Sequence, residues 1–318
     1  MAVPPQRSEV ALFRERPRRL LAVALALLAI AAGCSDGPRV PLSAMGHVVP
    51  VHFPAPTLGM PAREAIVYLP ASYDAPGAAA RRYPVVYFLH GGPGWHGDWF
   101  QHGDLARTLD RLIAEKRVPE VIAIAPDGHG AGRKGMSLWM DNWNGTSRIE
   151  TFLTRDVIAW ADSAFRTRPD ARDRALVGIS DGGDAAVRLL LEHPDLYGAG
   201  AGLSGRYHPH GSKGLEAVVG PEPYRTRNLI REAALGHLGS AARRMGGRFV
   251  YLDAGVLDNT AWDLIAMDMR MGQLDIAHET HLYVGYHDWP FWRRRLAIAL
   301  PAVTAGFTAA PHGSAQKL

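Results

Sequence analysis

The segment Arg174-Ala-Leu-Val-Gly-Ile-Ser-Asp-Gly-Gly183 decides how this chain is expected to fold. Its first half is an apolar run, which predicts a strand buried on both faces. Its second half is Gly178-x-Ser180-x-Gly182, followed by residues of helical character. This pattern is typical of a sharp strand-to-helix turn, in which small neighbours let a serine oxygen project above a sheet. The segment therefore predicts a strand, an exposed serine and a helix in succession.

The same alternation of strand and helix extends along most of the chain. Strands are predicted at Arg63–Leu69, Pro84–Leu89, Val121–Ala125, Ala175–Ile179, Phe249–Leu252 and His281–Val284, the last five of them as buried strands. Helical spacing of apolar residues occurs at Leu105–Glu115, Ile149–Ala164, Asp184–Leu191, Ala261–Gly272 and Phe291–Ala302. Strands that alternate with helices predict an α/β fold with a mostly parallel sheet and helices on both faces.

The chain is expected to form one globular domain behind a leader. Its 318 residues are 47% apolar and 21% charged, which is the balance of an ordinary folded protein. We expect a targeting segment at 1–33, a linker rich in proline and small residues at 34–50, and the α/β domain at 51–305. Within that domain, 203–245 is harder to interpret and is a candidate lid or excursion. Residues 306–318 are expected to be a loose tail.

The amino terminus has the pattern of a signal peptide. Basic residues at Arg14–Arg19 precede a 13-residue apolar run, Leu20–Ala32, which is too short to span a bilayer comfortably. Ala31-Ala32-Gly33 then precedes Cys34, the only cysteine, and resembles the lipobox of bacterial lipoproteins. The resemblance implies that Cys34 is lipidated and anchors an exported protein in the cell envelope. Ala31 departs from the usual leucine, so cleavage to a plainly secreted protein is the alternative.

The charge distribution argues against a nucleic-acid partner. The formal net charge is +4, from 35 basic and 31 acidic residues. Residues 1–33 contain five arginines and two glutamates, so the remainder holds 30 basic and 29 acidic residues. A chain with that balance has no electrostatic basis for binding a phosphate backbone.

A serine nucleophile needs a base, and the base needs an acid that orients it. After the predicted strand Phe249–Leu252, the chain offers Asp253 and Asp258, and after the last predicted strand it offers His287. Loops at the carboxyl ends of parallel strands are where such sites assemble, and the expected chain order is serine, acid, histidine. Asp258 is favoured as the acid because a loop position can reach the histidine, and Asp253 remains the competitor.

The glycines that follow the strand Pro84–Leu89 suggest the second half of an oxyanion hole. His90-Gly91-Gly92 lets backbone N–H groups approach a substrate oxygen closely. The expected donors are the N–H of Gly92 and that of Asp181, the residue after the serine. The alternative is a tight turn with no donor role. His90 is expected to brace this loop.

Taken together, the motifs resemble a known family. They are Tyr87-Phe-Leu-His-Gly-Gly92, Asp98-Trp99, Ala125-Pro-Asp-Gly128, Gly178-Ile-Ser-Asp-Gly-Gly183, Asp253-x-Gly255-x-x-Asp258 and His287-Asp-Trp-x-x-Trp292. In this order they resemble the esterase branch of the α/β-hydrolases, which includes S-formylglutathione hydrolases (esterase D), feruloyl esterases, enterochelin esterases and mycobacterial mycolyltransferases. The resemblance implies Ser180, Asp258 and His287 as a catalytic triad, and Gly92 and Asp181 as oxyanion donors.

Aromatic loop residues and the absence of cofactor motifs complete the prediction. Tryptophans expected near the carboxyl edge of the sheet are Trp95, Trp99, Trp139, Trp143 and Trp289. They are candidates for an apolar pocket wall, and each is alternatively part of a loop core. Asp141-Asn-Trp-Asn-Gly145 has oxygen ligands but no acidic residue that closes a calcium loop, so no metal is expected. No cofactor motif is present.

These observations predict a serine carboxylesterase that hydrolyses a small-molecule ester through an acyl-enzyme. An acyltransferase would use the same residues. A lipid-anchored binding protein that keeps the fold without catalysis is the alternative from another class.

Overall fold

The computed structural model describes residues 45–130, 135, 137–208, 216–225, 228 and 233–307. By its contacts the chain divides into two units, Met1–Arg39 and Val40–Leu318, and every described residue belongs to the second. The predicted signal peptide at 1–33 and the lipidation site Cys34 therefore lie outside the described residues, as does the tail beyond 307. Among the described helices, none has both the length and the apolar character needed to cross a membrane.

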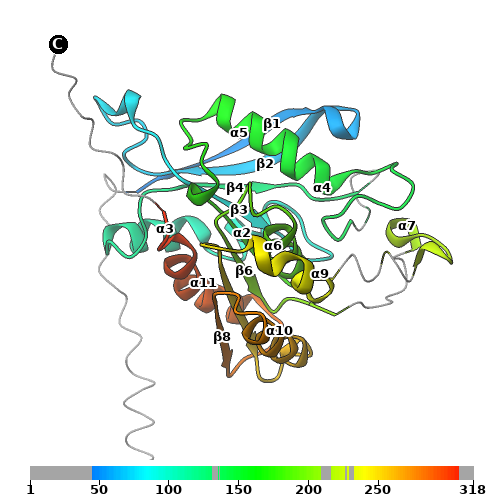
Figure 1. Ribbon diagram of the computed structural model, residues 1–318. Coiled ribbons are helices and arrows are strands. Elements are labelled where there is room, and N and C mark those ends of the chain that lie inside the picture. The colour runs from blue at the N-terminus through cyan, green and yellow to red at the C-terminus, as the bar shows by residue number, and fades with distance from the viewer. Residues whose placement is uncertain are drawn as a thin grey trace, which may run out of the picture. The chain divides into compact units, whose positions relative to one another are not determined.

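The fold is built on one eight-stranded sheet with the spatial order β1-β2-β4-β3-β5-β6-β7-β8 (Figure 1). The strands are β1 His47–Ala55, β2 Met60–Leu69, β3 Val85–Leu89, β4 Ile122–Pro126, β5 Arg174–Ile179, β6 Ala199–Leu203, β7 Phe249–Gly255 and β8 His278–Tyr283. β1 and β2 pair antiparallel, as do β2 and β4, and every later pair is parallel. The predicted α/β-hydrolase architecture is confirmed.

Helices cover both faces of the sheet. They are α2 Asp98–Gln101, α3 Leu105–Ala114, α4 Ile149–Thr151, the π-helical segment η5 Phe152–Val157, α5 Ile158–Ala164, α6 Asp181–Glu192, α7 Glu216–Val219, α9 Ala234–Ala241, α10 Ala261–Gln273 and α11 Trp289–Thr304. Short 3-10 turns are η2 Pro56–Leu58, η3 Ala78–Ala80, η6 Ala171–Asp173 and η7 Ala242–Arg244. One face packs against η5, α6, α9 and α10, and the other against α2, α3 and α11. The sheet is thus buried between two apolar layers.

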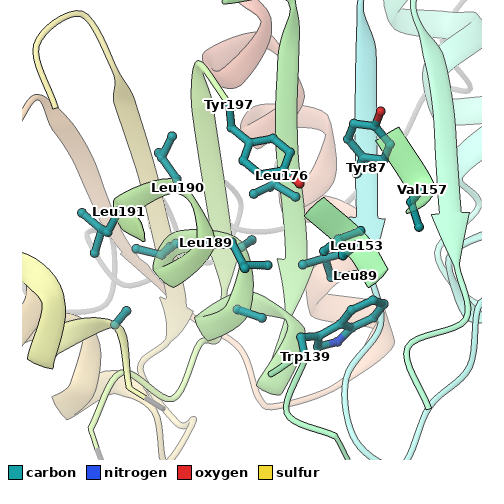
Figure 2. Close-up of a cluster of buried hydrophobic side chains, with 14 of the residues drawn as sticks. Tyr87, Leu89, Trp139, Leu153, Val157, Leu176, Leu189, Leu190, Leu191 and Tyr197 are labelled. Carbon is teal, nitrogen blue, oxygen red and sulfur yellow. The ribbon is translucent and has the colours of Figure 1, made fainter. Parts of the chain in front are cut away.

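Figure 2 shows side chains of the first of these layers. Leu89 of β3, Leu176 of β5 and Leu189 of α6 belong to one buried cluster, to which a loop adds Trp139. All four side chains are buried. At roughly 1.5–3 kcal/mol for each large apolar side chain removed from water, this packing holds α6 firmly on the sheet. The turn between β5 and α6 is therefore flanked by a buried strand and a buried helix face.

Three strands differ from the prediction. β1 begins at His47, inside the segment 34–50 that was predicted as a linker, and it forms an edge where prolines are tolerated. β6 was not predicted, because its sequence Ala-Gly-Ala-Gly-Leu has low strand propensity. β8 was predicted as a buried strand at His281–Val284, but it is the other edge strand and is only half-buried.

The segment 203–245 is partly core. α9 packs on α6, and its Ala234 and Leu238 belong to the same apolar cluster as Leu189. This part is therefore an excursion that returns to the domain and contributes to its core. Residues 209–215, 226–227 and 229–232 of this candidate lid lie outside the described residues, and the rest of 203–245 is described.

Candidate active site

Ser180 sits on a strained turn between β5 and α6. Its φ is 54° and its ψ is −123°, a backbone conformation that side chains rarely adopt. A Cβ at Gly178 would lie 1.8 Å from the carbonyl oxygen of Gly182, and one at Gly182 would lie 2.4 Å from that of Leu89. Only glycine fits at either position. Such a conformation costs roughly 1–3 kcal/mol, which the packed strand and helix around it must offset.

His287 connects Ser180 to Asp258. Its Nε2 lies 2.9 Å from Ser180 Oγ, and its Nδ1 lies 2.9 and 3.0 Å from the two carboxylate oxygens of Asp258. Because Nδ1 faces a carboxylate, it carries the proton, and the lone pair on Nε2 is free to accept the serine proton. The structure therefore brings together the three predicted residues, which follow β5, β7 and β8.

The surroundings of Asp258 favour its charged form. Its side chain is fully buried, and it accepts hydrogen bonds of 2.9 Å from both the N–H and the hydroxyl of Thr260. Burial by itself raises the pKa of Asp258, but hydrogen bonds from His287, Thr260 and Ser204 outweigh burial and lower it. Asp258 is consequently an anion when His287 takes up a proton.

The competing acid, Asp253, does not contact the histidine. Its Oδ2 accepts from the Tyr251 hydroxyl at 3.1 Å and from Arg295 Nε at 3.4 Å. Burial raises the pKa of Asp253 to about 7 against the opposing effect of Arg295. The geometry separates the two candidates that the sequence left open, since only Asp258 contacts His287.

His90 holds the loop that follows β3. Its Nδ1 donates to the Gly91 carbonyl at 2.9 Å, and its Nε2 accepts from the Gly128 N–H at 3.1 Å. The Trp139 indole donates to the His90 carbonyl at 3.0 Å. Burial lowers the pKa of His90 to about 4, so the ring is neutral and structural. A Cβ added at Gly91 would lie 3.1 Å from the Ser180 Cβ, which shows how closely this loop approaches the serine.

The two predicted oxyanion donors border one cavity. Asp181 is the first residue of α6 and directly follows Ser180. Gly92 lies in the neighbouring loop, and both residues line a cavity of about 120 Å³. His129, Leu138 and Trp139 form part of its opposite wall. The structure therefore brings the two predicted donor residues to the same cavity.

A larger hollow of about 500 Å³ opens on the other side of the glycine loop. Ser180 and His287 line it together with Trp289, Pro290 and Trp292. Residues 91–94 border both hollows and divide them. Ser180 therefore lines the mostly apolar groove, and the next residue, Asp181, lines the smaller cavity.

The five candidate tryptophans have different positions. Trp289 lines the groove beside Ser180, and Trp139 lines the smaller cavity. Trp99 is fully buried with its ring centroid 5.1 Å from that of Phe88, so its prediction as a pocket residue was wrong and it belongs to the core. Trp95 and Trp143 are 39% and 41% exposed and line neither hollow, so their predicted place in the pocket is also corrected.

Arg188 holds the loop that lines the smaller cavity, a role that the sequence did not predict. Its buried guanidinium on α6 donates to the carbonyls of Leu138 and Trp139 at 3.1 Å. It also contacts Glu150 at 3.1 Å and Glu192 at 3.0 Å. The loop that walls the smaller cavity is thus fastened to the helix that carries the serine. An arginine in a helix gives no sequence signal of such a role.

Three groups of acidic and histidine side chains lie close enough to share a cation among the described residues. Two of them contain Asp127, which pairs with the buried Arg63 at 3.3 Å. The third contains Glu150 and Glu192, and both contact Arg188. In each group an arginine already provides the positive charge that a metal would supply.

A strained serine after a parallel strand, with its histidine and acid at later strand ends, defines the α/β-hydrolase class. Residues 61–303 match the Esterase family model, and the chain therefore belongs to the Esterase family. It is 27% identical over 259 residues to an uncharacterized protein of Corynebacterium glutamicum, and this alignment covers 76% of the chain. It is also 32% identical over 143 residues to an esterase of Mycobacterium tuberculosis, which covers 44% of the chain.

Solved structures agree on the fold. A ferulic acid esterase has a TM-score of 0.74 at 22% identity, covering 84% of this chain and all of the other. The S-formylglutathione hydrolase of Agrobacterium tumefaciens has a TM-score of 0.68 at 16% identity, covering 85% and 98%. The chain spans 57% of the corynebacterial relative's length and 28% of the mycobacterial one's. These likenesses support the architecture, and activity is argued from the site itself.

Proposed function

We propose that this protein is a serine carboxylesterase that works through an acyl-enzyme. The observation that carries the proposal is the continuous contact from Ser180 Oγ through His287 to Asp258, with both steps close to 2.9 Å. Membership of the Esterase family supports the same reaction class. Ser180 is the nucleophile, His287 the general base and then acid, and Asp258 the group that orients the imidazole.

The reaction proceeds in two halves. Ser180 Oγ attacks the ester carbonyl carbon while Nε2 of His287 takes the serine proton. The tetrahedral intermediate collapses, the C–O bond to the alcohol breaks, and His287 returns the proton to the leaving alcohol. Water then attacks the acyl-serine, its proton passes to His287, and the acid is released as Ser180 Oγ recovers that proton.

Oxyanion stabilisation is assigned to the N–H groups of Gly92 and Asp181. Both residues border the cavity beside the serine, and the start of α6 adds the positive end of a helix dipole. Fixed donors of this kind act where negative charge develops and cost no reorganisation during the reaction.

The groove favours esters with an apolar or aromatic group. Trp289, Pro290 and Trp292 present flat apolar surfaces next to His287, the residue that protonates the leaving alcohol. The similarity to a ferulic acid esterase supports the inclusion of hydroxycinnamoyl esters among the substrates to be tested.

The test compares Ser180→Ala with a matched control, Ser240→Ala. Ser240 is exposed and lies on α9, away from the site. Hydrolysis of p-nitrophenyl acetate should fall to background in Ser180→Ala and stay at the wild-type rate in Ser240→Ala. A fluorophosphonate should label the wild type and not Ser180→Ala.

Wild-type turnover by Ser180→Ala would refute the mechanism. A wild-type Ser180 that does not react with the fluorophosphonate would favour a binding protein. An added alcohol that diverts the acyl group from water would point to acyl transfer.

Export with a lipid anchor at Cys34 is proposed from the amino-terminal pattern alone. The observation behind it is the basic and apolar sequence that ends in a single cysteine. A Cys34→Ala variant expressed in a bacterium should lose incorporation of labelled palmitate and enter the soluble fraction. Equal labelling of both forms would contradict the anchor.

A further inference from the structure

We propose that the smaller cavity is a subsite for a short hydroxyalkyl group on the acyl side of the ester, and that His129 Nε2 binds its hydroxyl. This inference rests on the proposed function, because it names the acyl groups that the same serine would receive. The cavity is bordered by Gly92 and Asp181, the residues assigned to the oxyanion, whereas the groove is bordered by His287, which protonates the alcohol. A substituent that enters the cavity therefore belongs to the acyl group.

His129 is held in place by a buried ion pair. Its Nδ1 lies 2.5 Å from Oδ1 of Asp127, and its backbone N–H donates to the same oxygen at 3.1 Å. Arg63 pairs with the other oxygen of Asp127 at 3.3 Å and also donates to the His129 carbonyl. Burial by itself raises the pKa of Asp127, but His129 and Arg63 outweigh burial and lower it to about 2. Because the charged carboxylate can only accept, Nδ1 of His129 donates to it.

Nε2 is the nitrogen of His129 that is left for a ligand. None of the described residues hydrogen-bonds to it, since the contacts of His129 run through Nδ1 and the backbone. The other polar side chains of the cavity wall, apart from Asp181, are paired with their neighbours. His90 hydrogen-bonds through both ring nitrogens, and Ser137 Oγ binds two backbone groups. The Trp139 indole donates to the His90 carbonyl at 3.0 Å.

The size and charge of the cavity select a short neutral chain that ends in a hydroxyl. A cavity of about 150 Å³ can hold a benzene ring, so about 120 Å³ suits a shorter aliphatic chain. Asp127 and Arg63 are paired with each other, so together they offer no net charge to a charged substituent. A hydroxyl can donate to a neutral imidazole and accept from a protonated one, so it suits Nε2 of His129 in either state. An alkyl end group would leave Nε2 without a partner.

The experiment compares two esters in the wild type and in His129→Asn. Methyl 3-hydroxypropionate and methyl butyrate differ only in a terminal hydroxyl against a methyl group, and their hydrolysis is followed by pH-stat titration. Asparagine can keep a side-chain N–H toward Asp127, but it lacks the distal nitrogen. The ratio of kcat/KM for the hydroxy ester to that for the butyrate should therefore fall roughly fivefold in the variant. Using the ratio cancels the difference in reactivity between the two esters.

His47→Asn is the matched control. His47 lies on the edge strand β1 and also faces an acid, Asp74, with Nε2 3.5 Å from the carboxylate, but both side chains are exposed. This variant should keep the wild-type ratio. An unchanged ratio in folded His129→Asn, or an equal fall in His47→Asn, would overturn the subsite. If His129→Asn does not fold, the wild type carries the test: with each kcat/KM divided by the ester's rate of alkaline hydrolysis, preference for the butyrate would overturn it.

Binding to Ser180→Ala separates the subsite from the reaction. Trp139 lines the cavity, so tryptophan fluorescence should respond when an ester enters it. Methyl 3-hydroxypropionate should bind this variant roughly fivefold more tightly than methyl butyrate does. If the wild type hydrolyses neither ester, the proposed function fails, and this binding measurement still decides on the subsite. Equal affinities of the two esters, or tighter binding of the butyrate, would overturn it.

Discussion

Ser180 adopts its strained conformation because the two glycines around it let three stretches of backbone meet. Gly178 faces the Gly182 carbonyl, and Gly182 faces the Leu89 carbonyl of β3. The motif is therefore a steric requirement as well as a sequence pattern. At this scale the sequence was informative, because close backbone contacts admit glycine and little else.

Gly178→Ala should destroy the turn. The new Cβ would start 1.8 Å from the Gly182 carbonyl oxygen, which is backbone and cannot rotate away. Hydrolysis of p-nitrophenyl acetate should fall to background, and the melting temperature should drop. Gly272→Ala is the control, since that glycine is in α10 with nothing within 4 Å of its Cβ position. It should gain roughly 0.5–1 kcal/mol of stability. An active Gly178→Ala would contradict the steric account.

Asp253 should make stability depend on pH. Burial raises its pKa to about 7 in the folded protein, above the ordinary carboxyl value near 4. Between those two values the native state holds more protons than the unfolded state, so this residue's contribution falls as pH rises through that window. Relative to the wild type, Asp253→Asn should therefore gain stability as pH rises from about 4 to about 7. Urea unfolding of both proteins across this range checks it, and a constant difference would contradict the assignment.

At the scale of elements, α6 connects the serine to the wall of the smaller cavity through Arg188. Arg188→Met should lower the free energy of unfolding by about 3–5 kcal/mol, because it leaves Glu150 and Glu192 without their buried partner. Arg172→Met, which removes an exposed pair with Asp170, should leave stability unchanged. Urea denaturation of the two variants gives the comparison, and equal losses would contradict the role of Arg188.

The elements show where sequence reasoning succeeds and where it fails. β3, β4, β5 and β7 were predictable because each is a continuous apolar run covered on both faces. β6 was not, because Ala and Gly have little strand propensity. They are needed there for close packing, since a Cβ at Gly200 would lie 2.9 Å from the Ala186 carbonyl of α6. β1 and β8 are the two edge strands, and an edge strand buries fewer of its side chains. For this reason β1 was not predicted, and β8 was wrongly predicted to be buried.

The chain order of the three triad residues was predictable from the sequence, but the residues that hold the site in place were not. Ser180, Asp258 and His287 follow strand ends, and strand ends can be located from apolar runs. Trp99 and Trp289 both follow strands as well, yet one enters the core and the other the groove. Loop position does not determine the direction of a side chain.

At the scale of the whole molecule, every residue assigned to catalysis lies between Gly92 and His287. We therefore expect catalysis not to depend on residues 1–33, the predicted signal peptide. A protein that begins at residue 34 should keep kcat/KM for p-nitrophenyl acetate within about twofold of the full chain, which is a change of about 0.4 kcal/mol. Loss of activity on truncation would show that the leader contributes to the folded enzyme.

The central claim is that Ser180 carries the acyl group during turnover. Rapid acid quenching during hydrolysis of p-nitrophenyl butyrate, followed by proteolysis and mass spectrometry, tests it most directly. The account predicts that the peptide containing Ser180 gains the mass of one acyl group and that this adduct is absent from Ser180→Ala. An acyl group found on another residue, or turnover of the Ser180→Ala protein at the wild-type rate, would contradict the account.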